Sequence, residues 1–235
     1  MTKTRQQLAF ASGLPEVVTF VRHAESERNA DPYSATLKAV PDCRISITAR
    51  GIRQGAMSAV PLREYLGAQQ SVRYSPHVRT AKTKDLLLAC YSPAELSAMD
   101  IKSSRLLVER NAGEFYGKTP DEIEALYPGI VKRCNRAGAF RAVPPNGESL
   151  MAASVRAARF IKKEFPRHAG KKLLVITHDG MIRCFRFLLE GWSEEKFNKE
   201  HRFNPPQNCG FTAYFFSPHA KRLERAFYNK VFFAA

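Results

Sequence analysis

The run from Lys171 to Thr177 reads Lys-Lys-Leu-Leu-Val-Ile-Thr, and it ends directly in His178-Asp179-Gly180. A short apolar run bounded by turn residues is typical of a strand buried inside a sheet. The run from Glu16 to Val21 has the same character, and Arg22-His23 follows it. The two runs therefore predict two buried strands that each lead into a histidine.

Other segments predict further strands and the helices between them. The strand candidates are Ser71 to Tyr74, Leu106 to Val108, Phe211 to Phe216 and Ala226 to Phe233. The helix candidates are Thr48 to about Leu66 with a break at Pro61, His77 to Cys90, a segment that starts at Thr119, Glu148 to Phe165, and Met181 to Leu189. Strands that alternate with such helices predict an α/β fold, in which helices flank both faces of a mainly parallel central sheet. We expect a single domain over residues 15–235, preceded by a flexible segment over residues 1–14.

Charged and imidazole side chains follow several of the predicted strands. Arg22 and His23 follow the first strand, Arg79 the second, Glu109 the third and His178 the run at 171–177. In a parallel α/β sheet the chemistry lies beyond the carboxyl ends of the strands. Arginines and an imidazole beside free backbone N–H groups predict an anion site that contains a nucleophile.

The chain resembles the histidine phosphatase superfamily, which includes the cofactor-dependent phosphoglycerate mutases, in several segments that occur in the family's order. In order, they are Val21-Arg22-His23-Ala24-Glu25-Ser26, Ile47-Thr48-Ala49-Arg50-Gly51-Ile52-Arg53-Gln54, Tyr74 to Thr83 with Arg79 at its centre, Glu109 to Gly117, Gly147-Glu148-Ser149, Val175-Ile176-Thr177-His178 with Arg183, and Asn208-Cys209-Gly210. The resemblance runs from Val18 to Phe216 and implies a phosphoglycerate mutase-like fold.

The resemblance also implies roles for individual residues. His23 would attack phosphorus and carry a phosphohistidine that water then hydrolyses, with Glu109 as the proton donor. Four residues would bind the phosphoryl group: Arg22, Asn29, Arg79 and His178. Of these, His178 would have a catalytic role as well. No cofactor and no metal are expected, because the arginines already supply positive charge.

Three residues are candidate contacts for the rest of the substrate: Ser26, Arg136 and Arg141. The two arginines belong to a basic cluster in the insertion after Glu109, a segment that covers the pocket mouth in relatives. We hypothesise that they meet a second anionic group on the substrate, and a solvated helix face is the alternative.

Two positions depart from the family pattern. Ala24 replaces the usual glycine after the nucleophile, which is harmless unless the backbone φ there is positive. Asp179 stands where glycine usually follows the second histidine, and Gly180 comes one place later. The Asp179 carboxylate should repel the substrate unless it points away or pairs with a base, and we expect it to cap the next helix, where its charge is favourable.

The motifs favour a metal-independent phosphatase acting on phosphate monoesters over a phosphoglycerate mutase. Ala112 stands where mutases have a tyrosine, Pro120 where they have a lysine, and Arg136 has no second arginine beside it. The mutase remains the alternative. A catalytically silent protein that binds a phosphorylated ligand or nucleic acid is more remote, because every catalytic position is filled.

The charge balance agrees with an anionic partner. The chain carries 37 Lys and Arg against 22 Asp and Glu, a formal net charge of +15. These cations are dispersed, so a small phosphorylated substrate is favoured over nucleic acid. Five scattered cysteines without a C-x-x-C pair favour a reducing, cytoplasmic setting, although the basic N-terminus leaves organelle targeting open. No apolar run is long enough for membrane insertion.

The remaining histidines carry weaker predictions. His77 lies within the arginine segment and is a minor candidate for the pocket. His168 lies in a polar turn and His219 follows Ser217-Pro218, so both are expected at the surface.

Overall fold

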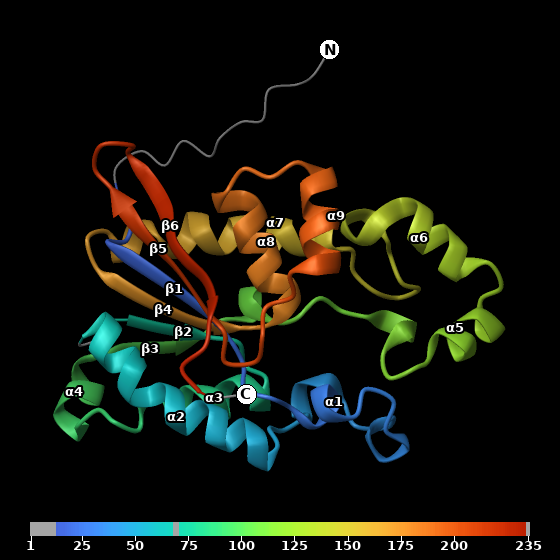
Figure 1. Cartoon of the computed structure of the whole chain (residues 1–235), viewed down its shortest axis with the longest axis horizontal. Coiled ribbons are helices and arrows are strands. Elements are labelled where there is room, and N and C mark those ends of the chain that lie inside the picture. Colours follow the sequence, from blue (N-terminus) through green and yellow to red (C-terminus); the bar gives the residue numbers. More distant parts are fainter. Residues whose placement is uncertain (1–12, 68–70, 234–235) are drawn as a thin grey trace.

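The computed structural model describes residues 13–67 and 71–233. Its strands form one sheet in the order β3-β2-β4-β1-β5-β6 (Figure 1). The strands are β1 (Val17–Arg22), β2 (Ser71–Tyr74), β3 (Asp100–Ser103), β4 (Lys172–Thr177), β5 (Phe211–Ser217) and β6 (Arg222–Lys230). The first four in this order run parallel, and β5 and β6 are antiparallel additions at the edge next to β1.

Helices cover both faces of this sheet, as Figure 1 shows. The helices are α1 (Glu27–Ala30), α2 (Ala49–Leu66), α3 (Val78–Leu88), α4 (Pro93–Ala98), α5 (Pro120–Leu126), α6 (Ile130–Arg141), α7 (Leu150–Glu164), α8 (Asp179–Leu189) and α9 (Glu194–Phe203). Helices α7 and α8 pack on one face, where Phe160 and Phe185 meet Phe20 of β1. Helices α2 and α3 cover the other, with Leu62 and Leu87 against Leu174 of β4. The expected fold class is confirmed.

Strand β4 lies at the centre of the parallel part of the sheet. It pairs with β1 on one side and β2 on the other, which explains its continuous apolar sequence. Arg22 at the end of β1 lies opposite Thr177 at the end of β4. His23 and His178 therefore leave the sheet side by side.

The strand predicted at Leu106 to Val108 is wrong. The strand that pairs with β2 is Asp100–Ser103, and residues Arg105–Leu107 form a 3₁₀ turn. The Thr177 hydroxyl at the end of β4 donates a hydrogen bond to the Leu107 carbonyl over 2.8 Å. The apolar run is buried because it crosses the carboxyl end of β4, and burial alone does not distinguish that from a strand.

The break predicted at Pro61 is also wrong, because α2 continues through it to Leu66. Pro61 removes a hydrogen bond to the carbonyl of Met57, a residue whose side chain is half exposed. On the opposite side Ala59 and Leu62 are buried, and this packing holds the helix together. At the C-terminus, the predicted strand 226–233 is displaced: β6 begins at Arg222 and ends at Lys230.

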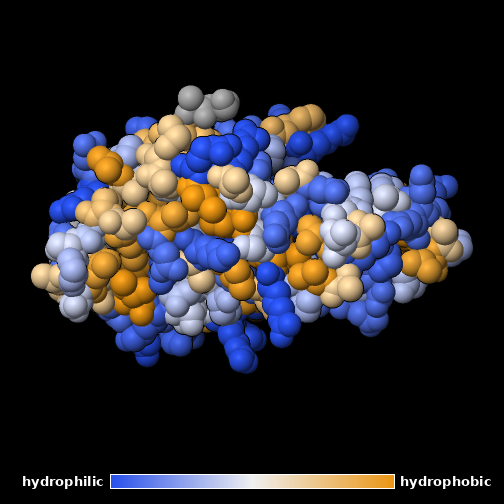
Figure 2. Space-filling model, turned by 90° about the horizontal axis from the view of Figure 1, so that it is seen from below, coloured by the Kyte–Doolittle hydropathy of each residue, from blue (hydrophilic) through white to orange (hydrophobic). Residues whose placement is uncertain are grey.

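At the N-terminal end of the described chain, Leu14 packs against the core and its carbonyl accepts a hydrogen bond from Gly170 N. Residues 1–12 of the predicted flexible segment lie outside the described residues. None of the helices described is both long and apolar enough to cross a membrane. On the face that includes α2, hydrophobic patches are interrupted by hydrophilic side chains (Figure 2).

Candidate active site

His23 follows β1 and is 4% exposed. Its Nδ1 lies 2.8 Å from the Ala24 carbonyl oxygen, which can only accept a hydrogen bond. We therefore assign the proton to Nδ1, which leaves a lone pair on Nε2, 3.2 Å from Arg79 Nε. Burial, and then the charges of Arg79 and Arg22, hold the pKa of His23 well below its usual range. His23 is thus a neutral imidazole whose Nε2 lone pair accepts a hydrogen bond from Arg79.

The loop after His23 is held by the motif that starts α2. Thr48 caps α2 and Gln54 accepts a hydrogen bond from Glu25 N over 2.8 Å. A side chain on Gly51 would lie 2.2 Å from the Glu25 carbonyl oxygen, so only glycine permits this approach. From α3, Thr83 accepts a hydrogen bond from Ala24 N. The side chains of Gln54 and Thr83 therefore hold the backbone of the loop that follows His23, called the nucleophile loop below.

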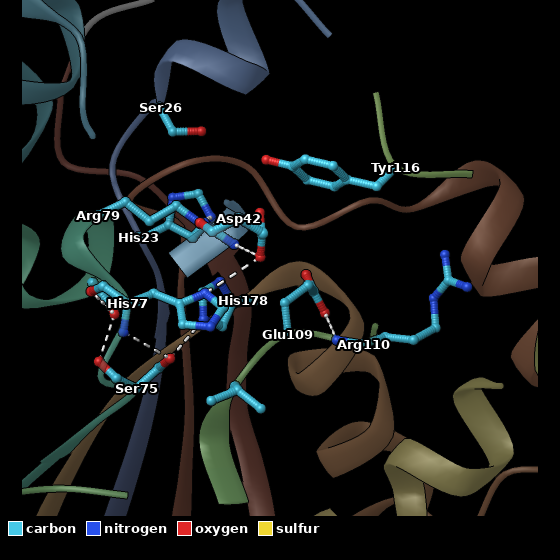
Figure 3. Close-up of polar contacts among 12 residues, drawn as sticks. His23, Ser26, Asp42, Ser75, His77, Arg79, Glu109, Arg110, Tyr116 and His178 are labelled. Carbon is cyan, nitrogen blue, oxygen red and sulfur yellow. Dashed lines mark hydrogen bonds and ion pairs between the residues drawn. The ribbon is translucent and has the colours of Figure 1, made fainter. Parts of the chain in front are cut away.

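His178 follows β4 and lies beside His23 with its ring centre 5.2 Å away (Figure 3). Its Nε2 is 2.8 Å from the Ser75 hydroxyl, whereas its buried Nδ1 has no hydrogen-bond partner. Burial, and next the charge of Arg79, lower the pKa of His178 well below its usual range. His77 is the third imidazole of this group, 4.9 Å from the His178 ring centre.

Two arginines border the histidines. Arg79 is buried, and its guanidinium contacts both His23 and Asp42. Arg22 donates from Nη1 to the Pro206 carbonyl over 2.7 Å, and its Nε is buried without a hydrogen-bond partner. Buried donors without a partner are costly, and they are tolerated where a ligand completes them.

Glu109 lies to one side of the histidines (Figure 3). Burial, and then the nearby charge of Asp179, raise the pKa of its carboxyl group. Its two oxygens accept from Arg110 N over 2.8 Å and Gly180 N over 3.3 Å. A side chain on Gly180 would lie 2.5 Å from Glu109 Oε1, which explains why glycine follows Asp179.

The loop that carries Glu109 is held from behind by Arg156 of α7. Arg156 donates to the carbonyls of Leu106 and Val108, over 3.1 and 2.9 Å, and forms an ion pair with Glu148 at 2.7 Å. Glu148 belongs to the Gly147-Glu148-Ser149 motif. That motif therefore supports the loop that carries Glu109, rather than contributing a group to the cavity.

A cavity of about 630 Å³ opens beside these groups. Its lining comes from three segments, namely Lys38 to Cys43, Val108 to Gly113 and the start of α8, together with side chains that include His77, Tyr116 and His201. The start of α8 brings its positive end toward the cavity, which favours an anion. Among the described residues, no cluster of three or more histidine, cysteine or acidic side chains is arranged to hold a metal ion.

The remaining predicted site residues are placed less directly. Ser26 is the N-cap of α1, and Asn29 Oδ1 accepts from the Ser26 hydroxyl and from Asn208 Nδ2. Asn208 also donates to the His23 carbonyl, so this group adjoins the nucleophile loop. Arg136 is exposed on α6, and Arg141 binds Glu194 of α9. Neither arginine lines the cavity.

The two departures from the family pattern are accommodated. Ala24 is absent from the described residues with positive φ, so no backbone strain arises there. His178 is the N-cap of α8, and Asp179 occupies the first helical position, one place later than a cap. There it forms a two-pronged ion pair with Arg183. Its charge is thus paired with a base on its own helix, and the expectation that it caps the helix is wrong.

Sequence reasoning missed some of the neighbours of the site. Asp42 gave no signal, because it begins a short 3₁₀ turn outside every motif. Ser75 lies in the Tyr74 to Thr83 segment that the resemblance singled out, and its hydroxyl is 2.8 Å from His178 Nε2. His168, predicted at the surface, is buried against Arg73 with its Nε2 3.1 Å away.

A profile of the histidine phosphatase superfamily (branch 1) matches residues 18–229 of the chain. The chain belongs to the histidine phosphatase superfamily. The chain is 24% identical over 168 residues to phosphoglycerate mutase-like protein 4 of Arabidopsis thaliana. The aligned region covers 71% of this chain and 67% of that protein. The chain is also 24% identical over 186 residues to a metal-independent phosphoserine phosphatase of the same plant, covering 77% and 71%.

Solved phosphatase structures share the fold. The alpha-ribazole phosphatase of Shigella flexneri superposes with a TM-score of 0.73 at 21% identity, over 91% of this chain and 96% of that chain. This likeness supports the mutase-like arrangement of sheet and helices.

Proposed function

We propose that this protein hydrolyses phosphate monoesters through a phosphohistidine on His23, without a metal ion, and acts on small phosphorylated substrates. The observation that carries the proposal is the state of His23. Its Nδ1–H is held by the Ala24 carbonyl, and its Nε2 lone pair is directed at Arg79 Nε among groups with unfilled hydrogen-bonding capacity. A neutral, oriented imidazole beside arginines is suited to attack on phosphorus.

In the first step His23 Nε2 forms a bond to phosphorus while the bond from phosphorus to the leaving oxygen breaks. Glu109, whose raised pKa favours its protonated form, gives its proton to that oxygen. Arg22, Arg79 and His178 hold the non-bridging oxygens. In the second step Glu109 takes a proton from water, the water oxygen bonds to phosphorus, and the His23–phosphorus bond breaks.

Hydrolysis is favoured over transfer between positions of a sugar acid. Ala112 lines the cavity with a methyl group where mutases place a tyrosine, and Arg136 lies outside it. Pro120 begins α5 and offers no cation where mutases have a lysine. These positions supply few groups to retain a bisphosphorylated intermediate.

The test uses an aryl phosphate, with and without a chelator, beside a His23→Ala variant. Turnover should survive the chelator and vanish in the variant, and acid-labile, alkali-stable phosphate should appear on the wild-type chain only. Activity in His23→Ala would refute the nucleophile. Faster conversion of 3-phosphoglycerate to its isomer than hydrolysis, with a response to 2,3-bisphosphoglycerate, would favour the mutase.

A further inference from the structure

Arg79 has all three of its guanidinium nitrogens engaged within the chain. Its Nε lies 3.2 Å from His23 Nε2, its Nη1 donates to the Asp42 carbonyl over 2.6 Å, and its Nη2 donates to Asp42 Oδ2 over 3.0 Å. The same Asp42 oxygen lies 3.4 Å from His77 Nδ1. Figure 3 shows the Asp42 carboxylate among these groups. The carboxylate and the backbone carbonyl of Asp42 thus occupy the two ends of the planar fork that suits phosphoryl oxygens.

Asp42 belongs to a segment, residues 38–43, that forms one side of the cavity. Beyond Asp42 the chain is anchored by Ile45, which is fully buried, and before it Tyr116 donates from its hydroxyl to the Val40 carbonyl over 3.3 Å. The backbone is therefore tied on both sides of Asp42. The Asp42 side chain is 36% exposed, which leaves it room to rotate toward solvent while the backbone stays in place.

We propose that the Asp42 carboxylate is an internal competitor for the phosphate site, and that a phosphoryl group must displace it from Arg79 to bind. The inference rests on the proposed function in taking Arg79 as the arginine that binds phosphoryl oxygens. Rotation of the carboxylate frees Nη2, and the incoming oxygens draw the guanidinium away from His23 Nε2. Displacement of Asp42 and exposure of the nucleophile's lone pair are then one event.

The charge of Asp42 is what makes it a competitor. A hydrogen bond between an arginine and a carboxylate is roughly twice as strong as one between neutral groups. An asparagine in its place keeps the shape and an oxygen for Nη2 but loses the charge, so a phosphate ion displaces it more easily. If Asp42 instead serves to hold Arg79 in position, the same replacement weakens phosphate binding. The two roles predict changes of opposite sign.

The experiment is a calorimetric titration of inorganic phosphate into the wild-type chain and into Asp42→Asn, Asp42→Ala and Asp31→Asn variants. Asp31, exposed at the end of α1, forms no ion pair among the described residues, so its variant is a control for net charge. We expect Asp42→Asn to lower the Kd for phosphate roughly fivefold to tenfold, Asp42→Ala to lower it at least as much, and Asp31→Asn to leave it within about twofold. Thermal unfolding confirms that each variant is folded.

An unchanged or raised Kd in both Asp42 variants would overturn the inference, as would an equal gain in Asp31→Asn. Absence of binding in wild type and both Asp42 variants would overturn it too. The titration needs no turnover. Tighter binding in Asp42→Asn by a chain that hydrolyses no aryl phosphate would therefore uphold the competitor and refute the proposed function, whereas active enzyme with unaltered phosphate binding would do the reverse.

Discussion

Two buried clusters of histidine, arginine and acidic side chains lie at opposite ends of the parallel sheet. At the carboxyl ends, His23, His178, Arg22 and Arg79 lie together, and Asp42, which binds Arg79, lines the cavity. At the amino ends, Arg73 and His168 meet Glu164 and Asp100. Arg73 Nε binds Glu164 over 2.8 Å, its Nη2 binds Asp100 over 2.6 Å and contacts His168, and His168 Nδ1 lies 2.6 Å from the Glu164 carbonyl oxygen.

The two clusters differ in what is left unfilled. Both ring nitrogens of His168 have partners in the chain, and each guanidinium nitrogen of Arg73 does as well. In the other cluster Arg22 Nε, His77 Nδ1 and His178 Nδ1 are buried without a hydrogen-bond partner. The same residue types therefore close one region and leave the other incomplete. Unfilled polar capacity, rather than residue type, separates the ligand site from a structural network.

Matched histidine variants are the strongest test of this contrast. His178→Ala should lower the turnover of an aryl phosphate by roughly 10² to 10³, the usual cost of removing one group that stabilises a transition-state anion, with little effect on thermal stability. His168→Ala should leave kcat unchanged and lower the Tm, because Arg73 loses a buried partner. Initial rates and thermal unfolding measure both effects. Equal losses of activity in the two variants would break the distinction.

Arg73→Met tests whether the amino-end cluster is structural. It leaves the Glu164 carboxylate, only 6% exposed, without its close partner. The free energy of unfolding should fall by about 3–5 kcal/mol, measured by urea denaturation, with KM unchanged in the folded enzyme. Arg222→Met removes an exposed ion pair to Glu224 and should have a much smaller effect. A change in KM with Arg73→Met would couple the cluster to the site.

Glu109→Gln tests the acid in the carboxyl-end cluster. Because the pKa of Glu109 is raised and its protonated form is needed, the rate should fall as pH rises through that pKa. Because the pKa of His23 is lowered, protonation of its Nε2, which would remove the nucleophilic lone pair, occurs at a more acidic pH than for an ordinary histidine. The variant should hydrolyse alkyl phosphates roughly a hundredfold more slowly, 4-nitrophenyl phosphate less so, and lose the alkaline decline of kcat/KM. An alkaline decline that persists would exclude Glu109 as its source.

Arg136→Ala and Arg141→Ala address the basic insertion, and their effect should be the smallest. Arg141 is engaged by Glu194 and neither arginine lines the cavity. We expect KM values within about twofold of wild type for substrates with one or two anionic groups. A selective loss on bis-anionic substrates would restore these arginines as substrate contacts and show that α6 moves toward the cavity.

Much of the fold was predictable because its signals are local. The apolar runs of β1, β2 and β4 and the Thr-Pro-Asp-Glu start of α5 are read from neighbouring residues, and each lies within a residue or two of its predicted range. The errors arose where the local structure depends on contacts with residues far away in the sequence. Leu107 is buried by the end of β4 without joining a ladder, and Pro61 stays helical because Ala59 and Leu62 are packed.

The sequence by itself determined the family, the fold class and the candidates His23, Arg79, Glu109 and His178, because the motifs that carry them occur in a recognisable order along the chain. It placed His178 in the site, but it put His168, which flanks the same strand, at the surface, whereas the fold buries it. Only the tertiary structure decided that His168 is enclosed by Arg73 and Glu164 while His178 keeps a nitrogen unfilled. It alone brought Asp42 onto Arg79, because hydrogen bonding between residues 37 positions apart depends on how the chain folds back on itself.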